Sequence, residues 1–354
     1  MESFISEHLP DGLLDLPAGR LHEKLDGPKL FHLPGRVKQP LVVSVLQHGN
    51  EISGWDAVRH LLGNTYARQT LPRSLILMIG NVEAAAKNRR FLPGQPDFNR
   101  CWPGHDGTPG PLHRLFAHMT AHVEMQQPLA CIDIHNNTGN NPHYSALNHL
   151  ESGHLALAAR FSPTALYFTH PRGTQSRAFG AFCPAITLEC GPPHLSAGAD
   201  HARAYLHSAL EDGEKFLDPA AGNPLSLFEM AATVFANPQY TLGFGNAEAD
   251  IVLRPDLEQF NFKSISPGTV LGHVKPAVLQ PLRVSAHRPG HSSDCFRVVD
   301  GKIIVSRTVM PVMLTTDARV VHQDCLCHLL QAVAGIETAN VTDPARVEPQ
   351  AQKQ

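Results

Sequence analysis

The sequence lacks the features that would assign it to a membrane, to a nucleic acid or to the secretory route. Its 354 residues carry a formal net charge of only −3, whereas a nucleic-acid or anionic-membrane partner would favour a basic face. The apolar run at 41–46 is far too short to cross a bilayer. The N-terminus has neither the positive nor the apolar region of a secretory signal. We therefore expect no nucleic-acid partner and no membrane partner.

A paired cysteine framework is also missing. The seven cysteines are an odd number and are scattered along the chain, which is typical of reduced thiols in a cytoplasmic protein. Hydrophobic residues make up 42% of the chain and charged residues 17%, so a packed core is expected. The 22 histidines stand out, but only their spacing can indicate a role.

Short apolar runs alternate with helical patterns between residues 39 and 221. Continuous apolar runs suit buried parallel strands, and their alternation with helices is typical of a mainly parallel, doubly wound mixed sheet in an α/β fold. The expected strands are 41–46, 74–80, 129–134, 165–169 and 185–190, and the expected helices are 54–62, 111–125 and 199–216.

The pattern changes at about residue 222, where helical periodicity fades. Short strands are expected at 270–274, 296–299 and 302–305, and Asp300-Gly301 between the last two is a strong hairpin signal. We predict an N-terminal extension, an α/β domain, a smaller β-rich C-terminal domain and a frayed tail. Their bounds are 1–38, 39–221, 222–340 and 341–354.

Polar residues stand at the ends of three predicted strands. His48 follows the first strand, His135 follows the third, and Glu189 lies at the end of the fifth. Because ligands of open α/β sheets bind in the crevice at the carboxyl ends of the strands, one crevice could collect all three side chains.

His48, Glu51 and His135 are the candidate metal ligands. His48 and Glu51 stand at i and i+3 where a helix is expected to begin, so both can face one Zn²⁺. His135 supplies the third ligand, which leaves the fourth position of a catalytic zinc site for water, and Asp133 and Asn136 are possible supporting groups. The alternative for the short His-x-x-Glu pattern is a capped turn without a metal.

Glu189 ends an otherwise apolar strand. A carboxylate there is costly unless it is paired or has a chemical role. Beside a water activated by a metal it could act as general base and then return the proton to the leaving nitrogen. The alternative is an ordinary surface strand end.

A Pro/Gly-rich loop between residues 87 and 104 holds candidate substrate contacts. Arg100 with Asn99 suits a bidentate clamp on a carboxylate, and Arg90 could polarise a carbonyl and stabilise its oxyanion. The alternative is a solvated basic loop, which we prefer for Lys87 and Arg89.

A rival metal cluster lies near the end of the chain. His322, Cys325, Cys327 and His328 are soft ligands within seven residues. No second group of ligands with matching spacing exists elsewhere in the sequence. The neighbouring leucines favour an apolar core segment with buried thiols.

Four motifs together resemble the succinylglutamate desuccinylase/aspartoacylase family, a branch of the zinc carboxypeptidase-like hydrolases. They are His48-Gly49-Asn50-Glu51, Asp97-Phe98-Asn99-Arg100, Asp133-Ile134-His135-Asn136-Asn137-Thr138 and Leu188-Glu189-Cys190-Gly191-Pro192. The resemblance implies one Zn²⁺ per chain on His48, Glu51 and His135, with Glu189 as general base and acid. It also implies a carbonyl contact from Arg90 and substrate-carboxylate contacts from Asn99 and Arg100.

Two further features of the family match this sequence less well. Arg177 lies roughly where family members place another substrate-binding arginine, although the intervening loop differs in length. The family's C-terminal-domain tyrosine has no counterpart, since Tyr240 is the only tyrosine there and lies in no recognisable motif.

The predicted function is zinc-dependent hydrolysis of a small amide, most simply an N-acyl amino acid, by a cytoplasmic enzyme that could form a homo-oligomer. One alternative is a metallocarboxypeptidase acting on peptides or cell-wall stem peptides; the short segment between Glu51 and His135 favours the acylase. The other is a non-catalytic zinc-binding module, which would not need Glu189.

Overall fold

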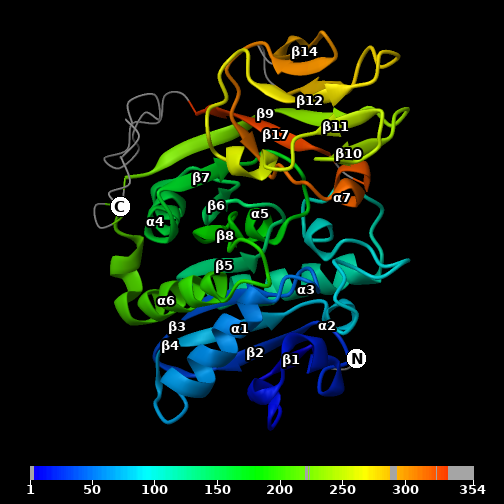
Figure 1. The fold of residues 1–354 in the computed structure, drawn as a ribbon. Coiled ribbons are helices and arrows are strands. Elements are labelled where there is room, and N and C mark those ends of the chain that lie inside the picture. The colour runs from blue at the N-terminus through cyan, green and yellow to red at the C-terminus, as the bar shows by residue number, and fades with distance from the viewer. Residues whose placement is uncertain (1–3, 220–221, 223, 288–292, 324, 334–354) are drawn as a thin grey trace. The chain divides into compact units, whose positions relative to one another are not determined.

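The structure is a computed structural model and describes residues 4–219, 222, 224–287, 293–323 and 325–333 (Figure 1). Its contacts divide the chain into two units. Within the described residues, the first unit holds the chain up to Asn136 and His143–Leu227, and the second holds Asn137–Pro142 and the chain from Phe228 onward. The domain boundaries drawn from the sequence stay predictions, and the predicted tail at 341–354 lies outside the described residues.

The first unit is built on a mixed, mainly parallel sheet, which confirms the predicted α/β fold class. Its strand order is β1-β2-β4-β3-β5-β8-β6-β7. The pairs β2–β4 and β6–β8 run antiparallel, and the other neighbours run parallel. The strands are Ile5–Ser6 (β1), Lys29–Leu33 (β2), Gly35–Val45 (β3), Leu71–Ile79 (β4), Ala130–His135 (β5), Tyr144–Leu147 (β6), Thr164–Tyr167 (β7) and Ala185–Glu189 (β8).

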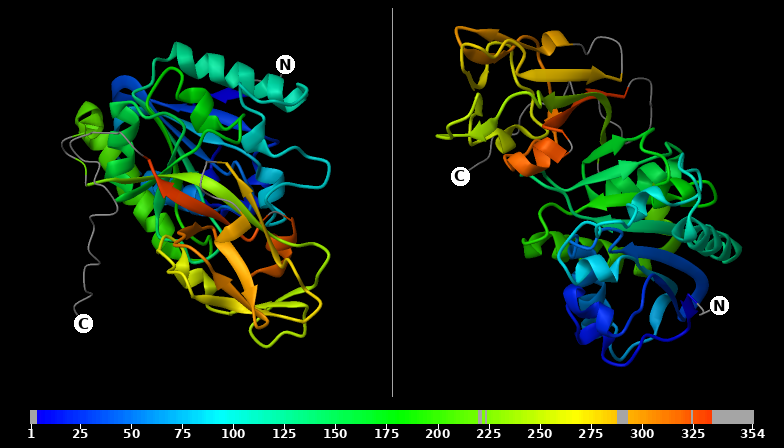
Figure 2. Two further views of the ribbon diagram at one scale, coloured as in Figure 1. Left: turned by 90° about the horizontal axis from the view of Figure 1, so that it is seen from above. Right: turned by 90° about the vertical axis from the view of Figure 1, so that its right-hand side faces the viewer.

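Helices cover both faces of this sheet (Figure 2). They are Ser53–His60 (α1), Val82–Ala85 (α2), Pro111–Met125 (α3), Ser152–Phe161 (α4), Gln175–Phe179 (α5) and Ser196–Asp212 (α6). Helices α3 and α5 pack against one face through Phe116 and Phe179, and Trp102 from the loop before α3 joins the same core cluster. Helix α1 lies close to the other face, where a Cβ on Gly54 would come within 2.9 Å of Ile134. Among the described residues, no helix combines the length and apolar character needed to span a bilayer.

The second unit is rich in β-structure. Strand β9 pairs antiparallel with β13 and β17, and β17 pairs with β16. A separate sheet has the order β10-β11-β12-β15-β14. The elements are Ser226–Ala236 (β9, which begins in the first unit), Leu242–Phe244 (β10), Ile251–Leu253 (β11), Val270–Val274 (β12), Leu282–Ala286 (β13), Phe296–Val299 (β14), Lys302–Val305 (β15), Pro311–Val312 (β16), Ala318–Gln323 (α7) and Cys327–Ala332 (β17).

The predicted hairpin joins β14 to β15. Asp300 and Gly301 both have positive φ, at 50° and 70°, as a two-residue type I′ turn requires. Val299 pairs with Lys302 across the turn. The Asp-Gly signal is therefore confirmed.

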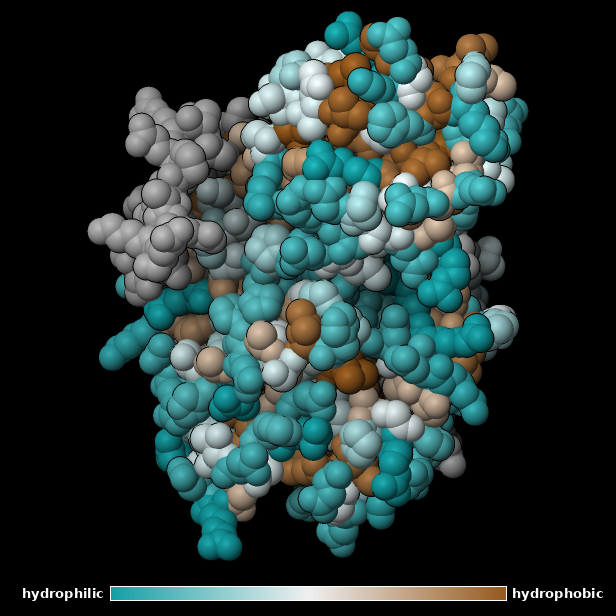
Figure 3. All heavy atoms as spheres, viewed as in Figure 1, coloured by the Kyte–Doolittle hydropathy of each residue, from teal (hydrophilic) through white to brown (hydrophobic). Residues whose placement is uncertain are grey.

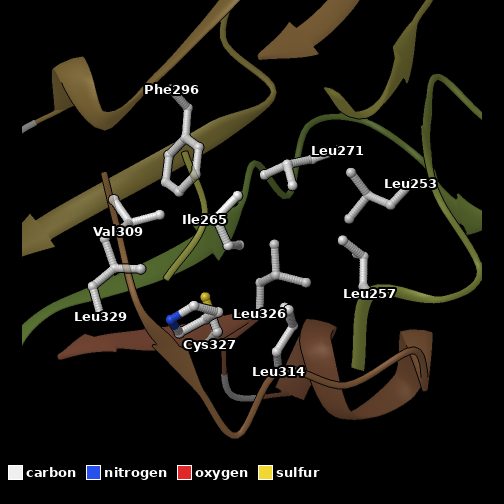
Figure 4. Close-up of a pocket in the computed structure, with 11 residues that line it drawn as sticks. Leu253, Leu257, Ile265, Leu271, Phe296, Val309, Leu314, Leu326, Cys327 and Leu329 are labelled. Atoms are coloured by element: carbon white, nitrogen blue, oxygen red, sulfur yellow. The ribbon is translucent and has the colours of Figure 1, made fainter. Parts of the chain in front are cut away.

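Apolar side chains fill the interior of the second unit and gather on the part of its surface seen in Figure 3. A cavity of about 20 Å³ lies among them, lined by Leu253, Leu257, Ile265, Leu271, Phe296, Val309, Pro311, Leu314, Leu326, Cys327 and Leu329 (Figure 4). This volume is near that of a single water site and the walls offer no charged group. It is therefore a packing gap and not a substrate pocket.

Candidate functional site

A tight turn after β3 carries the first two predicted ligands, His48 and Glu51. The backbone N–H of Glu51 donates to the carbonyl of His48 (3.1 Å), which brings the two side chains to the same side of the chain. Gly49 between them lies against α2, where a Cβ would come within 2.2 Å of the backbone nitrogen of Ala85. Glycine is therefore required at this position of the turn.

The structure brings His48, Glu51 and His135 together in the first unit. Nδ1 of His48 lies 2.7 Å from one carboxylate oxygen of Glu51, and Nδ1 of His135 lies 2.7 Å from the other. The two imidazole rings are 5.0 Å apart between centroids. All three side chains are buried, and one potential ligand atom from each lies within 4.8 Å of the other two.

A second carboxylate contacts each imidazole at Nε2, the nitrogen that does not face Glu51. Nε2 of His48 lies 3.0 Å from Oδ1 of Asp97, and Nε2 of His135 lies 2.9 Å from Oδ2 of Asp133. When Nε2–H donates to these oxygens, the Nδ1 lone pairs are turned toward Glu51, which is the arrangement found around metal-ligating histidines. Two imidazoles and a carboxylate are also a donor set of catalytic zinc sites. The residues present therefore fit a zinc ion.

The charges of this cluster are strongly coupled. Burial would raise the pKa of Glu51, but the imidazoles of His48 and His135 hold it well below its usual range. Burial would lower the pKa of His135, but the carboxylates of Asp133 and Glu51 raise it well above its ordinary value. Because an imidazole must lose its Nδ1 proton to ligate a metal through that atom, a cation competes with a proton for His135.

Asp97 links the candidate metal ligand His48 to Arg90. Its Oδ2 accepts hydrogen bonds from Nη2 (3.0 Å) and Nε (3.3 Å) of Arg90, while its Oδ1 faces His48. Nη1 of Arg90 also lies 3.5 Å from Oε1 of Glu51. Burial would raise the pKa of Asp97, but the hydrogen bond from His48 and the charges of Arg90 and Arg100 hold it well below its usual range.

Asp97 was named from the sequence only as part of a motif, and its role was not predicted. It opens the Asp-Phe-Asn-Arg motif and caps the 3-10 turn Phe98–Arg100 by accepting from the backbone N–H of Asn99 (2.9 Å). Its place at the start of this turn was a local signal. Its contacts with His48 and Arg90 depend on the folded loop and could not be read from spacing.

Glu189 lies beside His135. The two residues are register partners in the parallel pair β5–β8. Side chains at paired positions of neighbouring strands point to the same face of the sheet, and the strands are about 4.8 Å apart. Glu189 is half-buried, and its charge acts on Arg90. The half-exposed carboxylate is therefore next to the ligand cluster and within reach of solvent.

The predicted substrate residues have different surroundings. Asn99 is buried, and its Oδ1 accepts from the backbone N–H of Gln175 at the start of α5 (3.0 Å). Nη1 of Arg100 donates to the carbonyl of Asn99 (2.7 Å). Nη1 of Arg177 donates to the carbonyl of Thr169 (2.7 Å). These bonds go to the backbone, whereas Arg90 is the predicted substrate contact that touches the ligand cluster directly.

Asn136 fastens three segments around the cluster. Its Nδ2 donates to the hydroxyl of Ser53 (2.9 Å) and to the carbonyl of Gly191 (2.7 Å), and its backbone N–H donates to Oε2 of Glu51 (3.2 Å). One residue therefore joins the end of β5, the start of α1 and the loop after Glu189.

The rival cluster in the second unit does not assemble. Sγ of Cys325 lies 3.7 Å from Nε2 of His328, whose Nδ1 faces the hydroxyl of Thr233 at 3.0 Å. Among the described residues, this run forms no group of three potential ligands within 4.8 Å. The cysteines of the run are buried as free thiols, and so are the other cysteines of the chain.

Asp97→Asn is expected to weaken zinc binding by about 10- to 100-fold, which is the usual cost of losing a group that orients a ligating histidine. The change keeps the size of the side chain but removes the carboxylate that holds Nε2 of His48. Competition with a chelator measures the affinity. Asp11→Asn, at an exposed position, is the matched control. Equal affinities for the two variants would show that Asp97 does not orient His48.

A comparison with protein families matches residues 39–209 to the succinylglutamate desuccinylase/aspartoacylase catalytic domain. Residues 39–209 therefore match the catalytic domain of this family. The matched segment contains every predicted site residue from His48 to Glu189, so the resemblance inferred from the motifs is confirmed. Succinylglutamate desuccinylases and aspartoacylases are hydrolytic deacylases that in general depend on zinc. Hydrolysis of an amide is accordingly the reaction class that the family supports for this chain.

Solved structures from the same family share the fold. The succinylglutamate desuccinylase/aspartoacylase from Rhodobacter sphaeroides aligns with a TM-score of 0.56 at 13% identity over 85% of this chain and 87% of that chain. Murine aminoacylase 3 gives 0.54 at 18% identity over 84% and 96%. The succinylglutamate desuccinylase from Chromobacterium violaceum gives 0.50 at 17% identity over 84% and 86%. No curated protein matches the sequence.

Proposed function

We propose that the chain is a zinc-dependent hydrolase that cleaves an N-acyl amino acid, or a similar small amide, into a carboxylate and an amine. The observation that carries this proposal is the buried His48–Glu51–His135 cluster with Glu189 as the register partner of His135. It lies in a segment matched to a family of deacylases. A non-catalytic zinc-binding module would need the three ligands but not the neighbouring carboxylate.

Glu189 is the proposed general base and acid. Zinc, when bound, would supply the Lewis acidity that lowers the pKa of water toward about 7 and polarises a carbonyl. Glu189 accepts the proton of the attacking water and returns it to the nitrogen that leaves. Its half-buried position at the end of β8 supports this role, because the carboxylate can meet both solvent and the side chains beside His135.

Arg90 is proposed to stabilise the negative charge that develops on the scissile carbonyl oxygen. Burial would lower the pKa of this guanidinium, but Glu51 and Asp97 raise it, so the group stays cationic. Asp97 holds the guanidinium through two nitrogen atoms, which fixes its orientation before substrate binds. A donor held in place in this way typically contributes about 3 kcal/mol to transition-state stabilisation.

Asn99, Arg100 and Arg177 are proposed to bind the substrate carboxylate. The Oδ1 atom of Asn99 is held by the backbone of Gln175, so Nδ2 is the atom that would donate to a carboxylate. Arg100 follows directly and can supply a second, charge-assisted donor. Arg177 lies on α5, which starts at the same Gln175, and this shared element supports its inclusion.

The proposal places the protein in the cytoplasm and includes the formation of a homo-oligomer. The free, buried thiols of the chain fit a reducing compartment. An N-acyl amino acid is the proposed partner. Its free carboxylate matches the asparagine and arginine side chains proposed to bind it, and its amide matches the proposed roles of Glu189 and Arg90.

A substrate panel tests the proposed function. The zinc-loaded protein is expected to release the amine from N-acyl amino acids and to lose at least about 10-fold in kcat/KM when the substrate carboxylate is converted to an amide, because an arginine–carboxylate pair contributes about 1.5–3 kcal/mol. Peptides with a free C-terminus are assayed in parallel, and the release of their C-terminal amino acid is measured. Faster cleavage of the peptides would instead identify a metallocarboxypeptidase, and inactivity on every amide with zinc bound would identify a binding module.

A further inference from the structure

A second group of three potential metal ligands lies between β6 and α4 of the first unit. His149 and Glu151 belong to the connecting loop, and His154 lies in the first turn of α4. Oε2 of Glu151 is 4.0 Å from Nδ1 of His149 and 3.5 Å from Nδ1 of His154. The imidazole rings face each other at 5.1 Å with an interplanar angle of 24°. One ligand atom from each residue lies within 4.8 Å of the other two.

His154 is the observation that points to a ligand. The residue is only 5% exposed, and neither of its ring nitrogens has a hydrogen-bond partner among the described residues. Buried polar side chains are nearly always partnered, so an exception calls for an explanation such as an ion. A neutral imidazole offers a nitrogen lone pair for coordination to such an ion.

His149 is already oriented as a ligand. Its Nε2 lies 3.3 Å from the carbonyl of Arg177, and donation of Nε2–H to this oxygen leaves the Nδ1 lone pair facing Glu151. Gly180 makes room for the ring, because a Cβ there would lie 2.4 Å from Cδ2 of His149. Arg177 in α5 thus supplies the hydrogen-bond acceptor, and Gly180 just after α5 leaves the space that the imidazole needs.

Glu151 completes a set of donors that suits a transition metal. It is the N-cap residue of α4, but its side chain makes no cap hydrogen bond to the helix. Tetrahedral zinc with bonds of about 2.0–2.2 Å places its ligand atoms roughly 3.3–3.6 Å apart. The separations of 3.5 and 4.0 Å need an adjustment of only a few tenths of an ångström. The Glu151 side chain is largely exposed, which leaves a path from solvent.

We propose that His149, Glu151 and His154 bind a second divalent transition-metal ion, with zinc favoured by the two imidazoles and one carboxylate. The site uses none of the residues of the His48–Glu51–His135 cluster. Because His149 also bonds to Arg177, the ion ties the loop before α4 to α5. It binds the folded chain and so stabilises this part of the first unit.

Metal counting on the full chain tests the proposal. The protein and its variants are equilibrated with Zn²⁺, desalted and analysed by mass spectrometry, with a Zn²⁺ titration by calorimetry. We expect two zinc ions on the wild type, one on Glu151→Gln, one on Glu51→Gln and none on the double variant, since each change removes one ligand set. His154→Leu, which fills the same buried space with an apolar group, is expected to behave like Glu151→Gln. Glu124→Gln, an exposed change in α3, is expected to keep both ions.

The outcomes separate this proposal from the proposed function. A wild type with one zinc that is lost in Glu51→Gln overturns the second site and leaves the first intact. Two ions on both the wild type and Glu151→Gln also overturn it. One zinc that is lost in Glu151→Gln and kept in Glu51→Gln supports the second site and counts against the first. Circular dichroism confirms that each variant is folded.

Discussion

Glu189→Gln is expected to lower the turnover of the amide by about 100-fold or more while zinc stays bound, because a general acid–base group typically contributes 10²- to 10⁴-fold. Glutamine keeps the size and the strand position of Glu189 but can neither take a proton from water nor return one to the leaving nitrogen. None of the three proposed metal ligands is changed, and the register partner His135 stays in place. Steady-state kinetics with a parallel zinc measurement checks both halves of the expectation.

Two comparisons make this result specific. Glu124→Gln carries the same chemical change at an exposed position of α3 and is expected to leave kcat within about two-fold, as surface substitutions usually do. The remaining activity of Glu189→Gln should also lose the acidic limb of its pH–rate profile, since that limb reports the essential base. Near-normal turnover in Glu189→Gln would remove Glu189 from the mechanism.

The strands that end at the candidate site could be predicted because they are buried on both faces. Continuous apolar runs gave β3, β5 and β8 to within a few residues, except that β3 begins at Gly35. The polar first half of β3 shows no apolar run, and its pairing with β4 is a long-range contact. The strand predictions were most accurate where burial on both faces requires several consecutive apolar residues.

Several elements of the first unit carried no comparable signal. Strand β6 has four residues, and its antiparallel pairing with β8 is set by the folded sheet and not by local pattern. Helix α4 is alanine- and leucine-rich with apolar residues on most sides, so it lacks the one-sided periodicity that marks a surface helix. Asn137–Pro142 cross into the second unit, which no feature of the composition indicated.

The candidate ligands and two of their supporting groups, Asp133 and Asn136, could be predicted, but the contacts of Asp97 could not. Strand ends and i, i+3 spacing are local, and these signals identified His48, Glu51 and His135. The carboxylate of Asp97 contacts His48, which lies 49 positions earlier in the sequence, and also Arg90. Only the folded loop defines these contacts. His149 and His154 were hidden among 22 histidines, because the burial of one imidazole and the backbone contact of the other are properties of the tertiary structure.

Glu51→Gln is expected to reduce zinc affinity at the first cluster by more than about 100-fold and to reduce activity in proportion, since even the loss of an orienting contact costs 10- to 100-fold. Glu51 has the largest expected effect because its carboxylate faces both imidazoles and accepts from the backbone of Asn136. Excess zinc should restore part of the activity of Glu51→Gln but none of that of Glu189→Gln, because only the first variant is limited by occupancy. If Glu51→Gln binds zinc as tightly as Glu124→Gln does, the carboxylate between the two histidines is a structural contact and the metal centre must be sought elsewhere.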